Sequence, residues 1–359
     1  MDKSKFQEYD KNMIDVQTPL ENIKFYSIRN KPFDVYGFYD YKNTEIFQRL
    51  PDDVAENTNN GVKKCHLESA GGRVRFTTNS KYVAIKADFH IVGPNSRTPQ
   101  LAIAGFDLYI DTELESRHYK PLLPPIDVTD GYETYIEFEN NTERHLTINF
   151  PYHTSVKEVY IGIEDGASLS AGMKYRNEKP VIFYGSSIVH GSCASRPGMI
   201  YENILSRRLN LNYTNLGFGG SAGGEEAIAR YMAELDMCMF VSDYDYNASD
   251  AQWLKNSHQR LYQIIRDKNP DIPYLIISKP DFCYDAEYAQ ERRKIIYDTY
   301  CCAFENGDRN VYYIDGSSFF RCRDWDNYFV DRVHPNDAGF LKMADVIEPV
   351  IIRALTSKI

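Results

Sequence analysis

The sequence lacks the features that mark membrane, secreted and nucleic-acid-binding proteins. It contains no run of about eighteen apolar residues, which excludes a membrane-spanning helix. Residues 1–8 have neither an apolar stretch nor a cleavage site, so we expect no secretory signal. The formal net charge is −10 and the basic residues form no stripe, which gives no support to nucleic-acid binding. We therefore expect a cytoplasmic protein that has neither nucleic acid nor a membrane as a partner.

Cysteine is also scarce and irregularly placed. The seven cysteines are an odd number, only Cys301 and Cys302 lie close together, and no Cys-x-x-Cys or Cys/His ligand spacing occurs. This pattern is typical of reduced thiols and predicts neither a disulfide framework nor a zinc site. The glycine patterns of dinucleotide-binding and P-loop sites are absent as well. We expect no metal and no cofactor, and the sequence leaves open whether the chain forms a homo-oligomer.

The chain divides into two halves that differ in hydrophobic period. Over residues 1–178, short segments rich in β-branched and aromatic residues are separated by turn signals, which predicts a β-sandwich of jelly-roll type. Over residues 179–359, short apolar runs alternate with helical stretches, which predicts an α/β domain with a flavodoxin-like, doubly wound parallel sheet. A chain of 359 residues is long enough for two domains, each with its own core.

The expected parallel strands are the apolar runs 181–184, 237–241, 274–277 and 311–314. The residues from 335 to 355 are expected to form a closing helix, with Pro335 at its first position. Ligands of such a sheet bind at the carboxyl ends of the strands, so we look there for reactive side chains.

Two motifs contain the parts of an activated serine. Ser187 follows the first apolar run and Gly185, where a sharp turn would present it at the sheet edge. A serine hydroxyl needs a base to take its proton and an acceptor that orients the base. His334 provides the base, and Asp331, three residues earlier, can fold back onto its Nδ1. Taken alone, each motif can also be an ordinary turn or helix cap.

Two further motifs can stabilise an oxyanion. Residues 215–224 contain five glycines between an expected strand and an expected helix, so the backbone of this loop can approach a ligand closely. Asn247 follows the run 237–241 and can offer its side-chain amide to an oxyanion. A glycine-rich turn and a turn asparagine are the alternative interpretations of these two motifs.

These four motifs, in this order, resemble those of the SGNH hydrolases, also called the GDSL esterase family. The resemblance implies that Ser187 is the nucleophile, that Asp331 and His334 complete its catalytic triad, and that Gly220 and Asn247 are oxyanion donors. The backbone N–H of Ser187 would be a third donor. The absence of Gly-x-Ser-x-Gly argues against the ordinary α/β-hydrolase fold.

Departures from the family pattern point to one branch of it. Gly-Asp-Ser-Leu is replaced by residues 185–188, Gly-Ser-Ser-Ile, and Gly-x-Asn-Asp by residues 245–248, Asp-Tyr-Asn-Ala. Residues 105–109, Gly-Phe-Asp-Leu-Tyr, match the Gly-x-Asp-Leu-Tyr motif of a β domain that precedes the hydrolase half in that branch. The resemblance thereby extends over nearly the whole chain.

The resemblance implies an esterase similar to carbohydrate O-acetylesterases, which act on acetylated mannan- or xylan-type oligosaccharides. Trp325 and Tyr328, just before the Asp-x-x-His motif, are candidate sugar-stacking residues, although Trp325 can equally belong to the core. A short-chain lipase or an acyl-thioesterase would use the same triad. A carbohydrate-binding protein with an inactive hydrolase half is the remaining alternative. The expected ligand is therefore a small-molecule or oligosaccharide ester.

Overall fold

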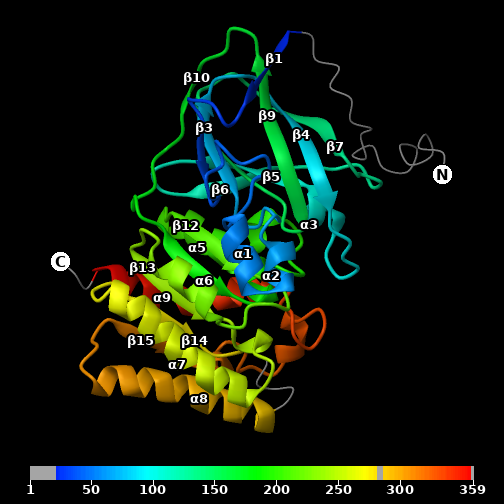
Figure 1. Cartoon of the computed structure of the whole chain (residues 1–359). Helices are drawn as coiled ribbons and strands as arrows, with labels where there is room; N and C mark the ends of the chain where they lie inside the picture. The colour runs from blue at the N-terminus through cyan, green and yellow to red at the C-terminus, as the bar shows by residue number, and fades with distance from the viewer. Residues whose placement is uncertain (1–21, 281–285, 357–359) are drawn as a thin grey trace.

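The computed structural model describes residues 22–280 and 286–356. The N-terminal half is built of antiparallel sheets, and the C-terminal half is a parallel sheet covered by helices (Figure 1). None of the described helices combines the length and the apolar character that crossing a membrane requires. The expectation for residues 1–8 lies outside the described residues.

The N-terminal half contains two mostly antiparallel sheets. The first has the strand order β1 (Ile23–Ser27), β9 (Thr154–Glu164), β4 (Tyr82–Val92), β7 (Gly131–Glu137). The second has the order β10 (Leu169–Ala171), β3 (Arg73–Thr78), β8 (Arg144–Asn149), β5 (Phe106–Asp111), β6 (Ser116–Leu122), and β2 (Asp34–Tyr36) also pairs with β3. Apolar residues of both sheets, among them Phe76 of β3 and Ile85 of β4, meet in one core. Two antiparallel sheets with a shared core agree with the β-rich expectation, and the jelly-roll connectivity stays a prediction.

The C-terminal half confirms the α/β class. Its five parallel strands have the order β12 (Tyr213–Gly217), β11 (Val181–Gly185), β13 (Met239–Asp243), β14 (Tyr274–Ile277), β15 (Val311–Ile314). In chain order this is 2-1-3-4-5, the order of flavodoxin-like sheets. Gly185 pairs with Gly217 on one side and with Asp243 on the other, so three strands end at the same level. The loops that follow these strands therefore begin side by side.

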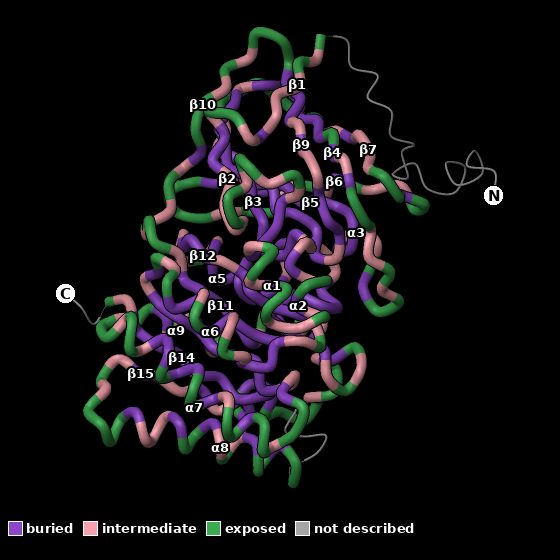
Figure 2. The backbone as a smooth tube through the Cα atoms, viewed as in Figure 1, coloured by how far each residue is buried: buried purple, intermediate pink, exposed green. Residues whose placement is uncertain are grey.

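Alternating side chains of β11 explain why helices cover both faces of the sheet. Val181 and Phe183 are buried with residues of α5 (Tyr201–Leu209) and α9 (Asp337–Thr356). Ile182 and Tyr184 are buried with residues of α6 (Glu226–Ala233), α7 (Ala251–Lys268) and α8 (Ala286–Glu305). Figure 2 shows the resulting band of buried backbone through the sheet. A central strand that is apolar at every position is what two covered faces require.

The closing helix begins later than the sequence pattern predicts. Helix α9 starts at Asp337, not at Pro335, because the Asn336 side chain accepts a hydrogen bond from the Gly339 N–H at 3.1 Å and caps the helix. Pro335 instead pairs with Phe329 in an isolated β-bridge. This two-residue correction places His334 in a hairpin-like loop ahead of the helix.

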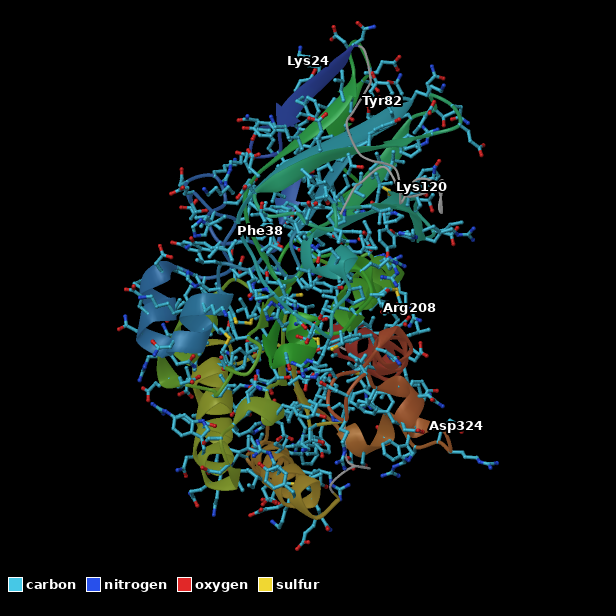
Figure 3. The ribbon with its side chains drawn as sticks, turned by 90° about the vertical axis from the view of Figure 1, so that its right-hand side faces the viewer. Lys24, Phe38, Tyr82, Lys120, Arg208 and Asp324 are labelled. Carbon is cyan, nitrogen blue, oxygen red and sulfur yellow. The ribbon has the colours of Figure 1, made fainter. Side chains whose placement is uncertain are left out.

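The N-terminal half also contains short helices that the β pattern did not predict: α1 (Asp52–Thr58), α2 (Asn60–Cys65) and α3 (Gln100–Ala104). Ala55 of α1 and Val62 of α2 are buried in the same core as Ile228 and Met232 of α6. Figure 3 shows these blue helices beside the C-terminal half rather than within the sheets. Part of the N-terminal half is thus packed into the other half. The division between residues 178 and 179 into two domains stays a prediction.

Candidate active site

Ser187 lies at the carboxyl edge of the parallel sheet, at the start of the short helix α4 (Ser187–His190). The preceding residue, Ser186, is fully buried, and its Oγ accepts a hydrogen bond from the Ile188 N–H at 3.2 Å. A Cβ at Gly185 would lie 2.2 Å from the carbonyl oxygen of Asp243, so only glycine fits this turn. Of the two neighbouring serines, Ser186 is thus occupied as a cap, and Ser187 is the one with partial exposure.

Ser187, His334 and Asp331 form one chain of hydrogen bonds. The Oγ atom of Ser187 is 2.9 Å from Nε2 of His334. The Nδ1 atom of His334 is 2.9 Å from both carboxylate oxygens of Asp331. This geometry fixes the tautomer if Asp331 is ionised, because Nδ1 then carries the proton and Nε2 is free to accept the serine proton. The structure therefore brings the three predicted triad residues together.

The loop that carries Asp331 and His334 is held by its own backbone. The N–H of Val330 donates to the carbonyl oxygen of His334 at 2.9 Å. Oδ1 of Asp331 accepts hydrogen bonds from the backbone N–H groups of Val333 at 3.2 Å and His334 at 2.8 Å. These contacts turn the carboxylate back toward the imidazole three residues later. The local Asp-x-x-His sequence therefore brings the carboxylate within reach of the imidazole.

The surroundings favour an ionised Asp331 and a neutral His334. Burial opposes ionisation of Asp331, but hydrogen bonds from the backbone and imidazole of His334 and from Arg97 outweigh it, so the pKa of the carboxyl lies well below its usual range. Burial lowers the pKa of His334, and the nearby Arg97 and His153 add to this effect, whereas Asp331 opposes it. A neutral imidazole is the form that a general base needs.

The glycine-rich loop and Asn247 meet beside this chain. A Cβ at Gly219 would lie 3.7 Å from the Cβ of Ser187, so the loop backbone closely approaches the serine. Gly220 has φ +71°, and a Cβ added there would meet nothing within 4 Å, so this residue faces open space. Asn247, at the end of the 3-10 helix η3 (Asp245–Asn247), accepts the Ala222 N–H at its Oδ1, 3.3 Å away. Its Nδ2 group has no acceptor within residues 22–280 and 286–356, so it can donate to a ligand.

Sequence reasoning missed a second hydrogen-bond chain under this loop. The N–H of Gly219 donates to Nδ1 of His190 at 3.3 Å, and Nε2 of His190 lies 2.8 Å from Oε2 of Glu68. Burial lowers the pKa of His190 to about 4, so its imidazole is neutral at neutral pH and donates from Nε2. Glu68 also contacts His153, 3.4 Å away. A carboxylate of the N-terminal half thus supports the loop that carries Gly220.

The same cluster is the nearest approach to a metal site among the described residues. The ligand atoms of Cys65, Glu68 and His190 lie within 4.8 Å of one another. Burial raises the pKa of Cys65 to about 11, which keeps the thiol protonated. Both ring nitrogens of His190 are already engaged in hydrogen bonds. The chemistry of this cluster therefore suits a polar network better than a metal ion.

The N-terminal half supplies several other contacts to the site. Asn59 donates from its Nδ2 to the carbonyl oxygen of Ser221 at 2.9 Å, in the glycine-rich loop. Arg49, which is fully buried, donates to the carbonyl oxygen of Gly217 at 2.7 Å. Arg97 contacts Asp331 at 2.6 Å. No local pattern in the sequence marks these residues, because each acts on a partner more than 150 positions away.

Trp325 and Tyr328 are the residues for which the sequence suggests stacking on a sugar ring. Both belong to the 3-10 helix η5 (Trp325–Tyr328) and pack, half-buried, against the core of the C-terminal half. The Tyr328 ring stacks on Phe320 with centroids 5.2 Å apart. The other tryptophan, Trp253, is 44% exposed and donates from its indole N–H to the carbonyl oxygen of Gly223 at 2.7 Å. Substrate stacking on Trp325 and Tyr328 stays a prediction.

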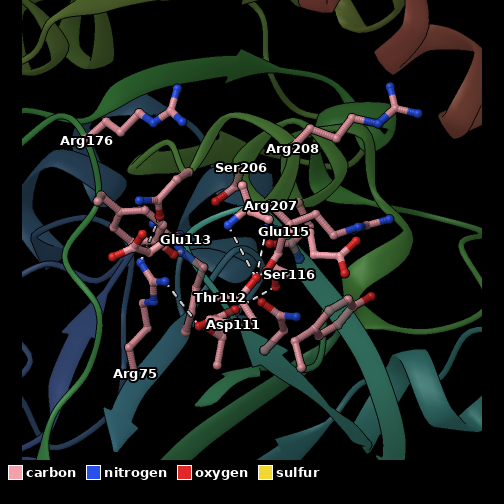
Figure 4. A pocket seen from close by; sticks show the side chains of 18 residues that line it. Arg75, Asp111, Thr112, Glu113, Glu115, Ser116, Arg176, Ser206, Arg207 and Arg208 are labelled. Carbon is pink, nitrogen blue, oxygen red and sulfur yellow. Dashed lines mark hydrogen bonds and ion pairs between the residues drawn. The ribbon is translucent and has the colours of Figure 1, made fainter. Parts of the chain in front are cut away.

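A separate cavity lies between the two halves, and Figure 4 shows its lining. None of the predicted site residues lines it. Some of its charged groups form ion pairs within the protein: Arg75 with Asp111 at 3.1 Å, and Arg208 with residues 345 and 348 of α9 at 2.9 and 2.8 Å. The cavity is therefore a feature of the seam between the halves and not of the Ser187 site.

Comparisons with known proteins agree with this architecture. Residues 178–352 match the GDSL-like Lipase/Acylhydrolase family, and residues 23–169 match the N-terminal GxDLY domain of SGNH-hydrolase-type esterases. No functionally curated protein sequence matches the chain.

Solved structures share the fold at low sequence identity. A protein from Bacteroides ovatus described as a GDSL-like lipase is 24% identical, with a TM-score of 0.83 over 93% of this chain and 98% of its own. A salicylyl-acyltransferase of a tetracycline biosynthetic pathway is 19% identical, with a TM-score of 0.76 over 94% and 99%. An acetyl xylan esterase from the rumen bacterium Butyrivibrio proteoclasticus is 12% identical, with a TM-score of 0.56 over 93% and 99%.

Proposed function

The chain belongs to the GDSL-like lipase/acylhydrolase family, in the branch with a GxDLY-type N-terminal domain, and on this basis we propose that it is a serine esterase that removes O-acetyl groups from carbohydrate. The observation that carries the proposal is the continuous hydrogen-bond chain from Ser187 Oγ through His334 to Asp331, with every link at 2.9 Å. Such a chain activates a hydroxyl for attack on an ester carbonyl.

In the proposed reaction, His334 Nε2 takes the hydroxyl proton as Ser187 Oγ bonds to the ester carbonyl carbon. The C–O bond to the sugar then breaks, and the imidazolium returns the proton to the leaving sugar oxygen. Water attacks the acetyl-serine with His334 again as the base, which releases acetate and restores the hydroxyl. Asp331 keeps the imidazole oriented and stabilises its positive charge throughout.

The carbonyl oxygen would become an oxyanion between the glycine-rich loop and Asn247. Among the residues that the structure describes, neither the N–H of Gly220 nor the Nδ2 group of Asn247 has a hydrogen-bond acceptor, and Oδ1 of Asn247 holds the loop. With the Ser187 N–H, these groups would supply three donors. Losing one oxyanion donor of this kind costs about 3–4 kcal/mol of transition-state stabilisation in other serine hydrolases.

The carbohydrate part of the proposal has separate support. Three of the solved structures with a similar fold are of family 2 carbohydrate esterases, and two of these are complexes with a cellulose oligomer or a related ligand. A fourth is of an acetyl xylan esterase. We expect acetylated manno- or xylo-oligosaccharides as substrates, with Trp325 and Tyr328 as candidate sugar contacts. In the cytoplasm, which we propose as its location, the substrate would be imported fragments rather than intact polymer.

One experiment tests both parts. Acetate release from acetylated oligosaccharides is measured beside a series of aryl esters from acetate to octanoate, with Ser187→Ala as the reference variant. We expect aryl acetate to exceed octanoate, and the variant to lose roughly three or more orders of magnitude in kcat while it stays folded. A fluorophosphonate label on Ser186, or on no serine, would remove the nucleophile assignment. Octanoate above acetate would favour the lipase or thioesterase alternative.

A second candidate function is acyl transfer. The salicylyl-acyltransferase with the same fold superposes over 94% of this chain, which favours an acyl-enzyme that passes its acyl group to an alcohol other than water. The two functions differ in the fate of the acyl-serine. An aryl ester assayed with and without sugar or aromatic alcohols distinguishes them, because a transferase forms a new ester and a hydrolase forms free acid. An inactive, carbohydrate-binding protein would yield neither product.

A further inference from the structure

The loop between β4 and α3 of the N-terminal half reaches the carboxylate of Asp331. Nη1 of Arg97 lies 2.6 Å from Oδ2 of Asp331, although 234 positions separate the two residues. Asp331 Oδ1 meanwhile accepts the backbone N–H groups of its own loop. The carboxylate is therefore held from three directions: by its own loop, by the imidazole of His334 and by a guanidinium of the other half.

Arg97 is positioned by contacts of its own loop. The side chain of Asn95 accepts the Arg97 N–H at Oδ1, 3.0 Å away, and its Nδ2 lies 3.2 Å from Nε2 of His153. The hydroxyl of Thr98 accepts the N–H of Cys193, in the loop after α4, at 3.2 Å. The N–H of Gly93 donates to the carbonyl oxygen of His153 at 2.7 Å. Both halves thus anchor the segment that presents the guanidinium.

From this geometry we infer that Arg97 is a positioning residue of the Ser187 site, supplied by the N-terminal half, which holds the Asp331 carboxylate against the His334 imidazole. The inference deepens the proposed esterase function and rests on it for its catalytic meaning. Even beside Arg97, 30% of the Asp331 side chain is exposed, so water competes for its oxygens. A charge-assisted hydrogen bond opposes that competition.

The positive charge also acts on His334. The groups that face this imidazole are Asp331, which raises its pKa, and Arg97 and His153, which lower it. Cys193 lies near Asp331 and Arg97, but burial raises its pKa to about 11, so it is uncharged at neutral pH. Removing the Arg97 charge takes away one of the influences that lower the pKa of His334. Since the base works in its neutral form, the acid limb of the activity profile moves to higher pH.

The test uses the full chain with Arg97→Ala, Arg97→Lys and, as a matched control, Arg117→Ala. Arg117 pairs with Glu115 on the surface of the same half, with 78% of its side chain exposed, and contacts none of the predicted site residues. We expect Arg97→Ala to lower kcat roughly tenfold with little change in KM, because the carboxylate keeps its hydrogen bond to the imidazole but is held less firmly in the productive orientation. The acid limb of the kcat–pH profile of Arg97→Ala should move to higher pH by roughly half a unit. Arg97→Lys should return the acid limb of the pH profile to its position in the parent and restore part of kcat.

A second readout does not depend on esterase activity. The titration of His334 is followed by NMR on histidine-labelled protein, and its signal is identified by its loss in His334→Gln. The inference is supported if the pKa of His334 is higher in Arg97→Ala than in the parent. The pKa should return toward the parent value in Arg97→Lys and stay unchanged in Arg117→Ala. If the His334 titration is the same in Arg97→Ala and the parent, the inference is overturned, whatever happens to kcat. If the titration shifts but no variant, including the parent, cleaves esters, the proposed function fails and the coupling of Arg97 to His334 stands.

Discussion

Replacing Arg49 should loosen both the fold and the site, because this side chain joins the two halves from the inside. Its guanidinium is buried and donates to five acceptors: the backbone carbonyl oxygens of residues 65, 68, 215 and 217, and the Oδ1 atom of Asn215. It also lies over the Phe218 ring, 4.9 Å from the centroid. Gly217 directly precedes the loop that carries Gly220, so the bonds connect α2 of the N-terminal half to the proposed oxyanion site.

The magnitude follows from two opposing effects. Burial is costly for the cation, and it lowers the pKa of Arg49 to about 10. Methionine would relieve that cost and fill a similar volume. It would also leave the carbonyl oxygens of Glu68 and Gly217 without the donor that Arg49 supplies, and each such buried acceptor costs about 1–3 kcal/mol. We therefore expect Arg49→Met to reduce the free energy of unfolding by about 3–5 kcal/mol, which resembles the loss from breaking a buried charged network.

Equilibrium unfolding in urea measures this change, and aryl acetate hydrolysis measures its effect on the site. Arg230→Met is the control, because Arg230 forms only an exposed pair with Glu226 one helical turn away, with 63% of its side chain accessible. That variant should stay within about 0.5 kcal/mol of the parent. A change below about 1 kcal/mol for Arg49→Met would refute the reasoning, since it would mean that water or a backbone shift satisfies the carbonyls at little cost.

Three further predictions address the catalytic chain, the substrate and the N-terminal half. His334→Ala should be nearly as damaging to kcat as loss of the serine, and Asp331→Asn less so, since the amide keeps part of the orientation; steady-state kinetics that show Asp331→Ala equal to the parent would make Asp331 a mere cap. Trp325→Ala should lower kcat/KM for an acetylated oligosaccharide much more than for aryl acetate, whereas an equal fall for both substrates would identify Trp325 as core. A fragment that starts near Lys179 should be poorly soluble or inactive, because it exposes the surface of α6 that α1 and α2 cover; full activity of a monodisperse fragment in gel filtration would contradict this.

The proposed chemistry depends on both halves, although only the C-terminal half contains the family's reactive motifs. The loop with Gly220 is supported by Glu68 through His190, and Asp331 is held by Arg97. An N-terminal half with these contacts is part of the site's framework and not a tethered module. Substitutions in it should therefore alter kcat as well as stability.

Features that depend on neighbouring residues could be predicted from the sequence. The apolar runs 181–184, 274–277 and 311–314 are strands because a strand covered on both faces must be apolar throughout. The strand expected at 237–241 is present but begins at Met239. The Asp331–His334 pair forms within one short loop, so its spacing alone predicts the contact. Placement of Ser187 at the sheet edge follows from the strand that precedes it.

Only the tertiary structure decided which distant side chains complete the site. Helices α1 and α2 are too short to show a helical period, and they exist because α6 offers an apolar face for them to cover. The contacts of Arg49, Glu68 and Arg97 depend on how the two halves pack, and a single charged residue in a β-rich segment has no local signature of its partner. Local sequence determined where the reactive groups lie, since backbone hydrogen bonds between residues close in the chain set the geometry of each motif. The packing of the two halves determined which side chains hold the reactive groups in place, since these contacts form between segments that become neighbours only after folding.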